Sequence, residues 1–282
     1  MHGQSTIQVS PTSDPGDQRF AEAFLRDGYV VFPAEDTLAL GRIRMLLAER
    51  GAKYLKLASW AKDESEAGEF LDHIGDHLSI PQLNDFRLAL INAMDEATWL
   101  KAACFALARR AIENLVGNEL AIQRKVNLSI QMPSDDSSLL PLHSDCWDGD
   151  SPFEVVLWIP LVDCFATKSM FLLPRHETTE TARNMARFGR RGTEDFFRDV
   201  EPRLSWLTVP FGSVVIFSHT VMHGNRVNLE ATTRWTLNCR FKSLFSPYWD
   251  KTLADSFEPL NIRPASRIGV DYRLPDGFRE AE

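Results

Sequence analysis

Two stretches in the second half of the chain alternate between apolar and polar residues, as a β-strand with one buried face does. Residues 126–132 place apolar side chains on one face and Asn127, Ser129 and Gln131 on the other. Residues 234–242 place apolar side chains on one face and put on the other Arg234, Thr236, Asn238 and Arg240. The polar face of a strand normally meets water, but in a barrel it can also line a polar cavity. The first stretch leads towards a histidine motif, which favours a cavity position for Asn127 and Gln131.

Runs of apolar β-formers predict further strands at 29–32, 153–159, 168–174, 204–210 and 212–217. The run at 153–159 is almost continuously apolar, which predicts a central strand buried on both faces. Helical spacing predicts helices at 20–25, 36–50 and 88–116, the first stopped by Asp27-Gly28 and the last with a break near Asp95. Residues 53–85 show no clear period, so their structure stays open.

An α-rich first half, followed by short strands between Gly and Pro turns, predicts an α+β fold. We expect a double-stranded β-helix, the jelly-roll or cupin-like form, with helices packed outside it. Residues 1–17 lack periodicity and predict a disordered or loosely draped arm. Residues 18–282 form one domain in this interpretation, with a mainly helical flank at 18–120, a jelly-roll core at 121–245 and an irregular C-terminal wrap at 246–282.

Bulk composition narrows the classes of partner. The 282 residues are 44% hydrophobic, which suffices for one large core. The net charge of -8 and a pI near 5.4 do not indicate the basic surface that binds nucleic acid or anionic lipid. We therefore expect a small-molecule substrate. No apolar segment reaches the length of a signal peptide or membrane span, which predicts a cytoplasmic protein with no membrane partner. The four cysteines lack metal-type spacing, and the role of Cys146 and the oligomeric state stay open.

Candidate chemistry begins at His143-Ser144-Asp145, where a nitrogen ligand and a carboxylate lie two residues apart. In extended chain, residues i and i+2 point to the same face, so both groups could bind one ion. A further histidine would complete a facial triad of two His and one carboxylate, which leaves metal positions open for dioxygen chemistry. Two candidates, His219 and His223, follow the predicted strand at 212–217.

The ordered set His143, Asp145, His223 and Arg234-x-Thr236 resembles the iron(II) and 2-oxoglutarate dependent dioxygenases of the phytanoyl-CoA dioxygenase type. Residues 150–164 are similar to a narrower group, the oxygenases of bacterial surface-carbohydrate gene clusters. The resemblance covers about residues 120–245 and makes 18–282 an oxygenase domain. It implies Fe(II), 2-oxoglutarate and O2 as cofactor and cosubstrates, with release of succinate and CO2. The implied reaction is hydroxylation of a small molecule such as a sugar or nucleotide-sugar precursor of surface polysaccharide.

The resemblance also implies a role for each residue of the site. It implies that His223, which is followed by Gly224, is the third metal ligand. His219 would then have a supporting or packing role. Arg234 and Thr236 would bind the distal carboxylate of 2-oxoglutarate, since a guanidinium and a neighbouring hydroxyl give forked, charge-assisted donors. Asn127 and Gln131 are further candidates for cofactor binding. The candidates for substrate contacts are Trp147, Lys168 and Ser169.

Two readings from other classes compete with an oxygenase. Two histidines, one aspartate and a water also make a catalytic zinc site, so a zinc-dependent hydrolase is an alternative. That reading leaves Arg234-x-Thr236 unexplained. A non-catalytic jelly-roll carbohydrate-binding protein that retains the metal motif is the other alternative.

Overall fold

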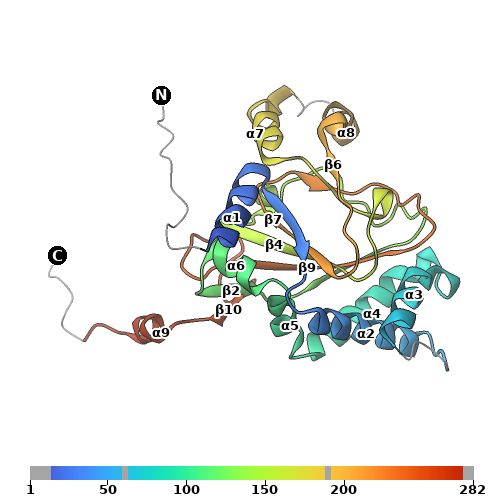
Figure 1. Cartoon of the computed structure of the whole chain (residues 1–282), viewed down its shortest axis with the longest axis horizontal. Helices are drawn as coiled ribbons and strands as arrows, with labels where there is room; N and C mark the ends of the chain where they lie inside the picture. The colour runs from blue at the N-terminus through green and yellow to red at the C-terminus, as the bar shows by residue number, and fades with distance from the viewer. Residues whose placement is uncertain (1–13, 59–62, 188–191, 276–282) are drawn as a thin grey trace.

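The computed structural model describes residues 14–58, 63–187 and 192–275. Within these ranges, two antiparallel sheets and the helices around them form the structure in Figure 1. This is the predicted α+β class with a double-stranded β-helix core.

The larger sheet has seven strands in the described part of the chain. Its main path runs through β1 (Tyr29–Pro33), β7 (Ser213–Ser218), β4 (Glu154–Pro160), β9 (Arg234–Ser243), β2 (Leu120–Gln123) and β10 (Phe257–Asn261). The long strand β9 pairs along one edge with β4. Along its other edge it pairs first with β3 (Asn127–Gln131) and then with β2. Strand β4 is buried at every position, as its continuous apolar run predicts.

The smaller sheet consists of β6 (Ser205–Trp206), β5 (Phe171–Leu172) and β8 (His223–Gly224). The strands predicted at 168–174 and 204–210 are therefore much shorter than expected. Lys168 belongs instead to a 3-10 turn at Ala166–Lys168, and Pro174, which has no N–H to donate, directly precedes the next helix. Two-residue strands carry no period of their own, so the sequence pattern could not resolve them.

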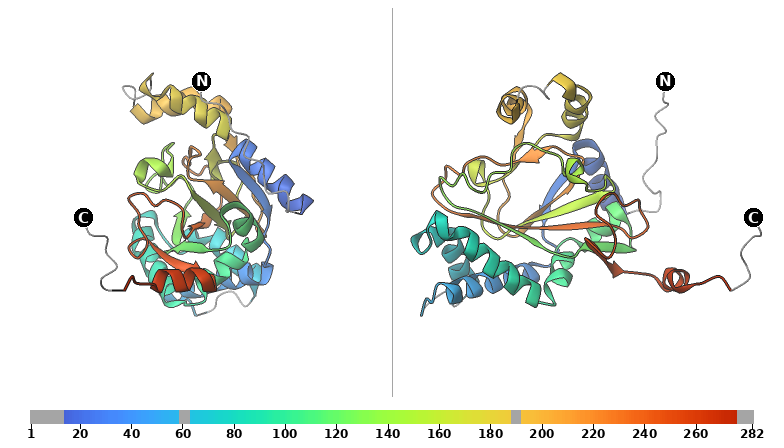
Figure 2. Two further views of the ribbon diagram at one scale, coloured as in Figure 1. Left: turned by 90° about the vertical axis from the view of Figure 1, so that its left-hand side faces the viewer. Right: turned by 180° about the vertical axis from the view of Figure 1, so that it is seen from behind.

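The described helices lie outside the two sheets. They are α1 (Pro15–Asp27), α2 (Thr37–Tyr54), α3 (Glu64–Asp72), α4 (Leu83–Glu96), α5 (Leu100–Ala106), α6 (Arg109–Val116), α7 (Arg175–Arg183), α8 (Gly192–Val200) and α9 (Pro264–Asp271). Figures 1 and 2 show α2 to α5 gathered along one side of the larger sheet, α7 and α8 beside β6, and α9 extending away from the body. The side chain of Asp36 caps α2, and α4 ends at Glu96, which confirms the predicted helix start and break. The helical stretch predicted at 88–116 begins earlier, with α4, and is divided a second time between α5 and α6.

The two faces of β9 have different environments. Trp235 is fully buried on the helical side, where its ring meets Phe86 edge-to-face and its Nε1–H donates to Leu71 O over 2.7 Å. Arg234 and Thr236 lie on the opposite face, which lines a cavity between the two sheets. The alternation seen in the sequence thus separates the hydrophobic core from the polar interior.

The ends of the chain differ from expectation in two places. Helix α1 begins at Pro15, inside the range 1–17 predicted as an arm, because Asp14 accepts a hydrogen bond from Gly16 N and caps it. Residues 1–13 of that range lie outside the described residues. The tail predicted as an irregular wrap contains β10, which pairs with β2, and the helix α9. Pro259 is tolerated in β10 because that strand lies at the edge of the sheet.

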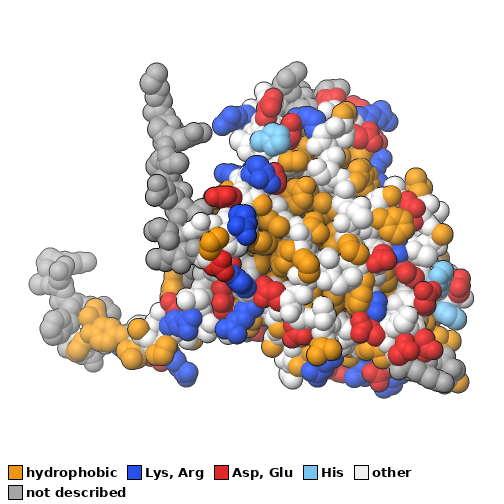
Figure 3. All heavy atoms as spheres, in the orientation of Figure 1, with side chains coloured by type: hydrophobic (Ala, Val, Ile, Leu, Met, Phe, Trp, Pro, Cys, Tyr) orange, Lys and Arg blue, Asp and Glu red, His pale blue; other side chains and the backbone are white. Residues whose placement is uncertain are grey.

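The segment 53–85, left open by the sequence, contains α3 and two 3-10 turns, while 59–62 lie outside the described residues. Figure 3 shows acidic and basic side chains mixed over one face of the molecule, apart from an apolar area over β1. No helix in the described ranges is long and apolar enough to cross a membrane.

Candidate metal centre

His143 and His223 come together through a short antiparallel bridge. The backbone N–H of His143 donates to His223 O over 3.0 Å, and His223 N donates to His143 O over 2.8 Å. The two ring centroids lie 4.4 Å apart. Each Nδ1 lies against a backbone carbonyl, Pro141 O at 2.8 Å and Val221 O at 3.0 Å. A carbonyl can only accept, so Nδ1 carries the proton and Nε2 keeps its lone pair for a metal.

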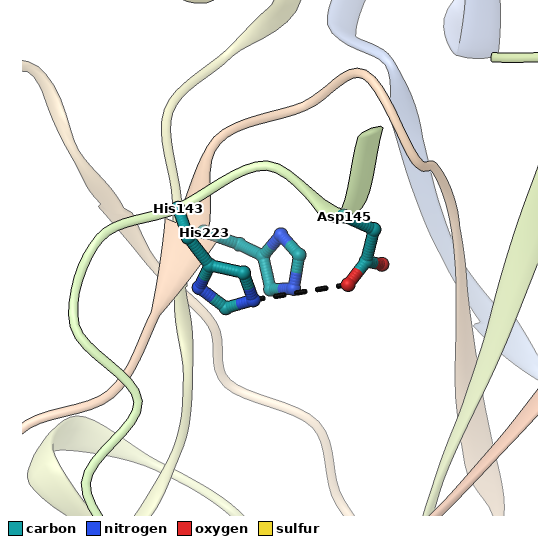
Figure 4. A group of neighbouring side chains, drawn as sticks. All are labelled: His143, Asp145 and His223. Atoms are coloured by element: carbon teal, nitrogen blue, oxygen red, sulfur yellow. Dashed lines mark ion pairs between the residues drawn. The ribbon is translucent and has the colours of Figure 1, made fainter. Parts of the chain in front are cut away.

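Asp145 completes the group, but not with the predicted strand geometry. His143 forms a β-bridge and Ser144 is extended, whereas Asp145 begins a 3-10 turn, Asp145–Asp148, that brings its carboxylate back to the imidazole. Asp145 Oδ1 lies 3.7 Å from His143 Nε2 (Figure 4). One ligand atom from each of His143, Asp145 and His223 lies within 4.8 Å of the others. The turn thus gathers a set that could hold one ion.

The protonation states of Asp145 and His223 suit a metal. Burial alone would raise the pKa of Asp145, but the side chain of His143 and the nearby cation of Arg240 hold that pKa well below its usual value. Burial lowers the pKa of His223 to about 4, so its imidazole is neutral near pH 7. A carboxylate and a neutral imidazole are the forms that bind metal ions.

Gly224 lets the chain beside His223 pack tightly. A Cβ at this position would lie 2.7 Å from Leu140 O and 2.9 Å from the ring of Phe171. A larger residue would push the strand carrying His223 away from its neighbours. The glycine after the histidine is therefore a packing requirement of the site.

Arg234 is a buried cation without an acidic partner among the described residues. It is 3% exposed, and its guanidinium donates to Ser169 O over 3.1 Å and to Ser129 Oγ over 3.3 Å. Its Nε and the hydroxyl of Thr236 have no hydrogen-bond partner within the described protein. Burial lowers the pKa of Arg234 to about 10, so the side chain still carries its charge near pH 7. An unpaired buried charge is costly, which makes this position suited to an anionic ligand.

Two adjoining cavities connect Arg234 with the candidate ligands. The inner one measures about 50 Å³ and is lined by Arg234, Thr236 and His223 among others. The outer one measures about 420 Å³ and is lined by all three candidate ligands. Both cavities are bordered by Ser129, Leu140, Phe217, His223 and Asn238. An extended molecule could therefore contact Arg234 at one end and the candidate metal position at the other.

The predicted pair Asn127 and Gln131 divides between two locations. Asn127 is exposed and lines the outer cavity. Gln131 is fully buried, but it lines neither of these cavities and donates to Arg226 O over 2.7 Å, which ties down the chain after His223. Ser129, between them on the same polar face, is the residue that contacts Arg234. The alternation included Ser129, but nothing in the sequence distinguished it from its neighbours.

None of the three predicted substrate candidates lines either cavity. Lys168 is 1% exposed and donates to Asp72 over 2.5 Å and to Thr232 over 2.6 Å. Ser169 contacts Arg234 through its backbone carbonyl. Trp147 is 47% exposed and lines neither cavity. Cys146 is a half-buried free thiol whose pKa burial raises to about 11.

A second group of potential ligands lies behind Asp145 and was not predicted. Asp150, Glu154 and His219 are buried, and one ligand atom from each lies within 4.8 Å of the others. Burial and the nearby Asp150 raise the pKa of Glu154 to about 7, while burial lowers the pKa of His219 to about 3. Asp150 and Glu154 lie four residues apart, but His219 comes from a distant segment, so local spacing alone could not reveal the group.

Comparisons with known proteins identify the fold. No protein-family model and no curated protein matches this chain. The solved structure of EctD from S. alaskensis in its apo form matches with a TM-score of 0.52 and 16% identity, covering 80% of this chain and 76% of EctD. The structure of EctD with 2-oxoglutarate and 5-hydroxyectoine also gives a TM-score of 0.52, with 17% identity over 86% of this chain and 80% of EctD. At this level of identity the likeness shows a shared fold.

Proposed function

We propose that this chain is a non-haem Fe(II) and 2-oxoglutarate dependent dioxygenase acting on a small molecule. The observation that carries the proposal is the unpaired buried guanidinium of Arg234, at the inner end of cavities shared with His143, Asp145 and His223. Neither a zinc hydrolase nor a carbohydrate-binding jelly roll accounts for a buried cation that needs an anionic ligand. The EctD structure that contains 2-oxoglutarate supports a site for the same cosubstrate in this fold.

The residues present fit the iron and its cosubstrate. His143, Asp145 and His223 would hold Fe(II), and a set of two His and one carboxylate leaves positions open for further ligands. Arg234, with Thr236 beside it, would bind the distal carboxylate of 2-oxoglutarate through charge-assisted hydrogen bonds. When bound, iron and 2-oxoglutarate supply with O2 the oxidising power that hydroxylates a substrate and releases succinate and CO2.

The chain's own contribution is to orient these molecules and to limit water. Ser129 holds the guanidinium of Arg234 from the neighbouring strand. Leu140 and Phe217 give both cavities an apolar boundary beside His223. Fewer waters around the bound carboxylate strengthen its attraction to Arg234, since charges interact more strongly where the dielectric is low.

The outer cavity fits a small polar substrate. Its volume of about 420 Å³ lies within the range of small-molecule sites, and hydroxyl, amide and charged side chains line it together with apolar ones. We propose a sugar or a nucleotide-linked sugar as the substrate class. This choice rests on the resemblance of residues 150–164 alone, and within that segment only Val156 and Trp158 line the cavities beside the candidate metal position.

Anaerobic mixing of the protein with Fe(II) and 2-oxoglutarate tests the proposal. The expected result is a weak visible charge-transfer band that needs both additions and disappears when zinc replaces iron, because the filled d shell of Zn²⁺ has no redox chemistry. Admission of O2 should then yield succinate, and a screen of sugars and nucleotide-sugars for faster succinate formation would identify the substrate. Iron that binds tightly without any band on addition of 2-oxoglutarate would contradict the proposal.

A further inference from the structure

Four polar side chains converge behind the candidate metal position. The Nδ1 atom of His219 lies 3.9 Å from Asp145 Oδ2, 4.0 Å from Asp150 Oδ1 and 3.7 Å from Glu154 Oε2. His219 is fully buried, and Asp145, Asp150 and Glu154 are 6%, 1% and 1% exposed. These separations are too long for direct hydrogen bonds. We call these four residues the His219 cluster.

Three atoms at the centre of this cluster lack partners. Asp150 Oδ1, Glu154 Oε2 and His219 Nδ1 make no hydrogen bond within the described protein, and neither does His219 Nε2. A buried polar atom without a partner destabilises the folded protein, and several such atoms around one point indicate a bound species between them. The cluster therefore has the features of a small polar binding site.

The other oxygen of each carboxylate is already engaged with a cation. Asp145 Oδ1 lies 3.3 Å from Arg240, and Asp150 Oδ2 lies 2.5 Å from Lys251 and 3.8 Å from Arg240. Glu154 Oε1 lies 3.8 Å from Lys242, which is itself fully buried. Three acidic side chains thus face three basic ones.

This balance decides what the cluster can bind. Even with all three carboxylates ionised, the three cations already neutralise them, so a divalent metal ion would add two uncompensated charges to a buried region. Burying unbalanced charge away from water is strongly unfavourable. A water molecule adds no charge, needs two to four polar partners, and commonly bridges polar groups more than 3.5 Å apart. Water is therefore the occupant that fits.

We propose that His219 is a positioning residue for Asp145 and acts through a water molecule bound in the His219 cluster. The inference rests on the proposed function, because it takes Asp145 as a metal ligand. In Figure 4, one oxygen of Asp145 faces His143 and the other points away from both imidazoles. A water held by His219 fixes that second oxygen, so Asp145 offers a single oxygen to the metal.

The backbone supports this coupling between the two groups. The hydroxyl of Ser144, between the two ligands His143 and Asp145, donates to His219 O over 2.8 Å. The turn that carries His219 leads within four residues to His223. The same short segments therefore place the metal ligands and the residue that orients one of them.

Two substitutions at His219 separate positioning from packing. His219→Asn keeps a polar amide close to the position of Nδ1, whereas His219→Leu fills a similar volume without a polar atom. Loss of an outer hydrogen-bond partner of a metal ligand typically weakens metal affinity about 10–100-fold. We expect His219→Leu to weaken Fe(II) and Co(II) binding by this factor in competition with a chelator, and His219→Asn to remain within about 3-fold of the original protein.

Control measurements distinguish this effect from a general loss of stability. Thr181→Val also removes a buried polar atom without a partner, but from α7, and should leave metal affinity unchanged. Affinity for 2-oxoglutarate, measured with saturating metal, should stay constant in all three variants because Arg234 is untouched. If His219→Leu does not fold, a crystal structure of the metal-loaded original protein decides, and a solvent oxygen within about 3.2 Å of His219 Nδ1 is expected.

Several outcomes would overturn the inference. Metal affinity equal to that of the original protein in His219→Leu, or an equal loss in the Asn and Leu variants, would remove the positioning role. A second metal ion that survives in His223→Ala would show that the cluster binds a cation instead of water. The proposed function fails separately, through a His223→Ala variant that binds one metal as tightly as the original protein does.

Discussion

The molecule contains two groups of histidine and carboxylate side chains that look alike by composition. His143, Asp145 and His223 form one group, and the second consists of Asp150, Glu154 and His219. The first group borders a cavity of about 420 Å³, whereas the second is fully enclosed and lies against three cations. Access to a ligand and the balance of nearby charge, more than residue type, decide which group suits a catalytic metal.

The two buried cations Arg234 and Lys168 show the same principle. Lys168 is paired with Asp72 at 2.5 Å, while Arg234 has no acidic partner within the described ranges. A paired buried ion is compensated by the protein itself. An unpaired one needs an anion from outside, and this is why Arg234 and not Lys168 indicates a binding site.

The largest effect expected from this comparison concerns the two histidines. His223→Ala should lose metal binding by much more than the ~10–100-fold expected for outer partners, because it removes a direct ligand. His219→Asn should retain the metal, as measured by metal content after gel filtration. A metal-free His219→Asn beside a metal-loaded His223→Ala would show that the wrong histidine has been taken as the ligand.

Breaking the charge balance of the enclosed group should mainly affect stability. Glu154→Ala leaves the fully buried Lys242 without its acidic partner, and removing one member of a buried ion pair costs about 3–5 kcal/mol. Replacing both, as Glu154→Leu with Lys242→Met, should recover most of the free energy of unfolding in denaturant titrations. The exposed Asp148 serves as a control, since Asp148→Ala should change stability by less than about 0.5 kcal/mol. A double variant as unstable as Glu154→Ala would contradict the charge-balance account.

A smaller loss is expected for the paired cation. Lys168→Met leaves the partly exposed Asp72 without its ammonium partner, which should cost about 1–3 kcal/mol in unfolding free energy. Because Lys168 lines neither cavity, affinity for 2-oxoglutarate should not change. Weaker 2-oxoglutarate binding in this variant would contradict the claim that Arg234, and not Lys168, indicates the binding site.

The smallest effects concern the polar face of β3. Gln131→Ala removes a buried hydrogen bond to Arg226 O and should cost about 1 kcal/mol of stability. Asn127→Ala, at the exposed rim of the outer cavity, should leave stability unchanged and alter only the response of succinate formation to substrate. Thermal unfolding and turnover of both variants test this assignment. A loss of stability in Asn127→Ala, with none in Gln131→Ala, would contradict it.

The sequence predicts those parts of the fold that carry a local period. The alternation along β9 separates Trp235 from Arg234 correctly, and the polar residue Asp36 marks the start of α2. The small sheet escapes prediction because its strands are two residues long and are defined by pairing with distant segments. In the same way β10 is hidden in a proline-containing tail and becomes a strand only through its pairing with β2.

For the candidate site, the sequence identifies the candidate metal ligands but not the residues that contact them in the fold. The spacing of His143 and Asp145 is informative, although a 3-10 turn and not a strand brings them together. The partners of Asp145 could not be predicted, because Arg240 and His219 approach it from segments more than 70 residues away along the chain. Such long-range contacts depend on the folded sheet.

The most direct test of the account is a titration of 2-oxoglutarate into the metal-loaded protein and its Arg234 variants. Truncating one partner of a buried charge pair costs about 2–5 kcal/mol, and every 1.4 kcal/mol is tenfold in affinity. Arg234→Ala should therefore bind 2-oxoglutarate roughly 30-fold or more weakly, with metal content unchanged. Arg234→Lys should lie in between, because lysine restores the charge without the fork. Unchanged affinity in Arg234→Ala would contradict the assignment of Arg234 as the anchor of the cosubstrate.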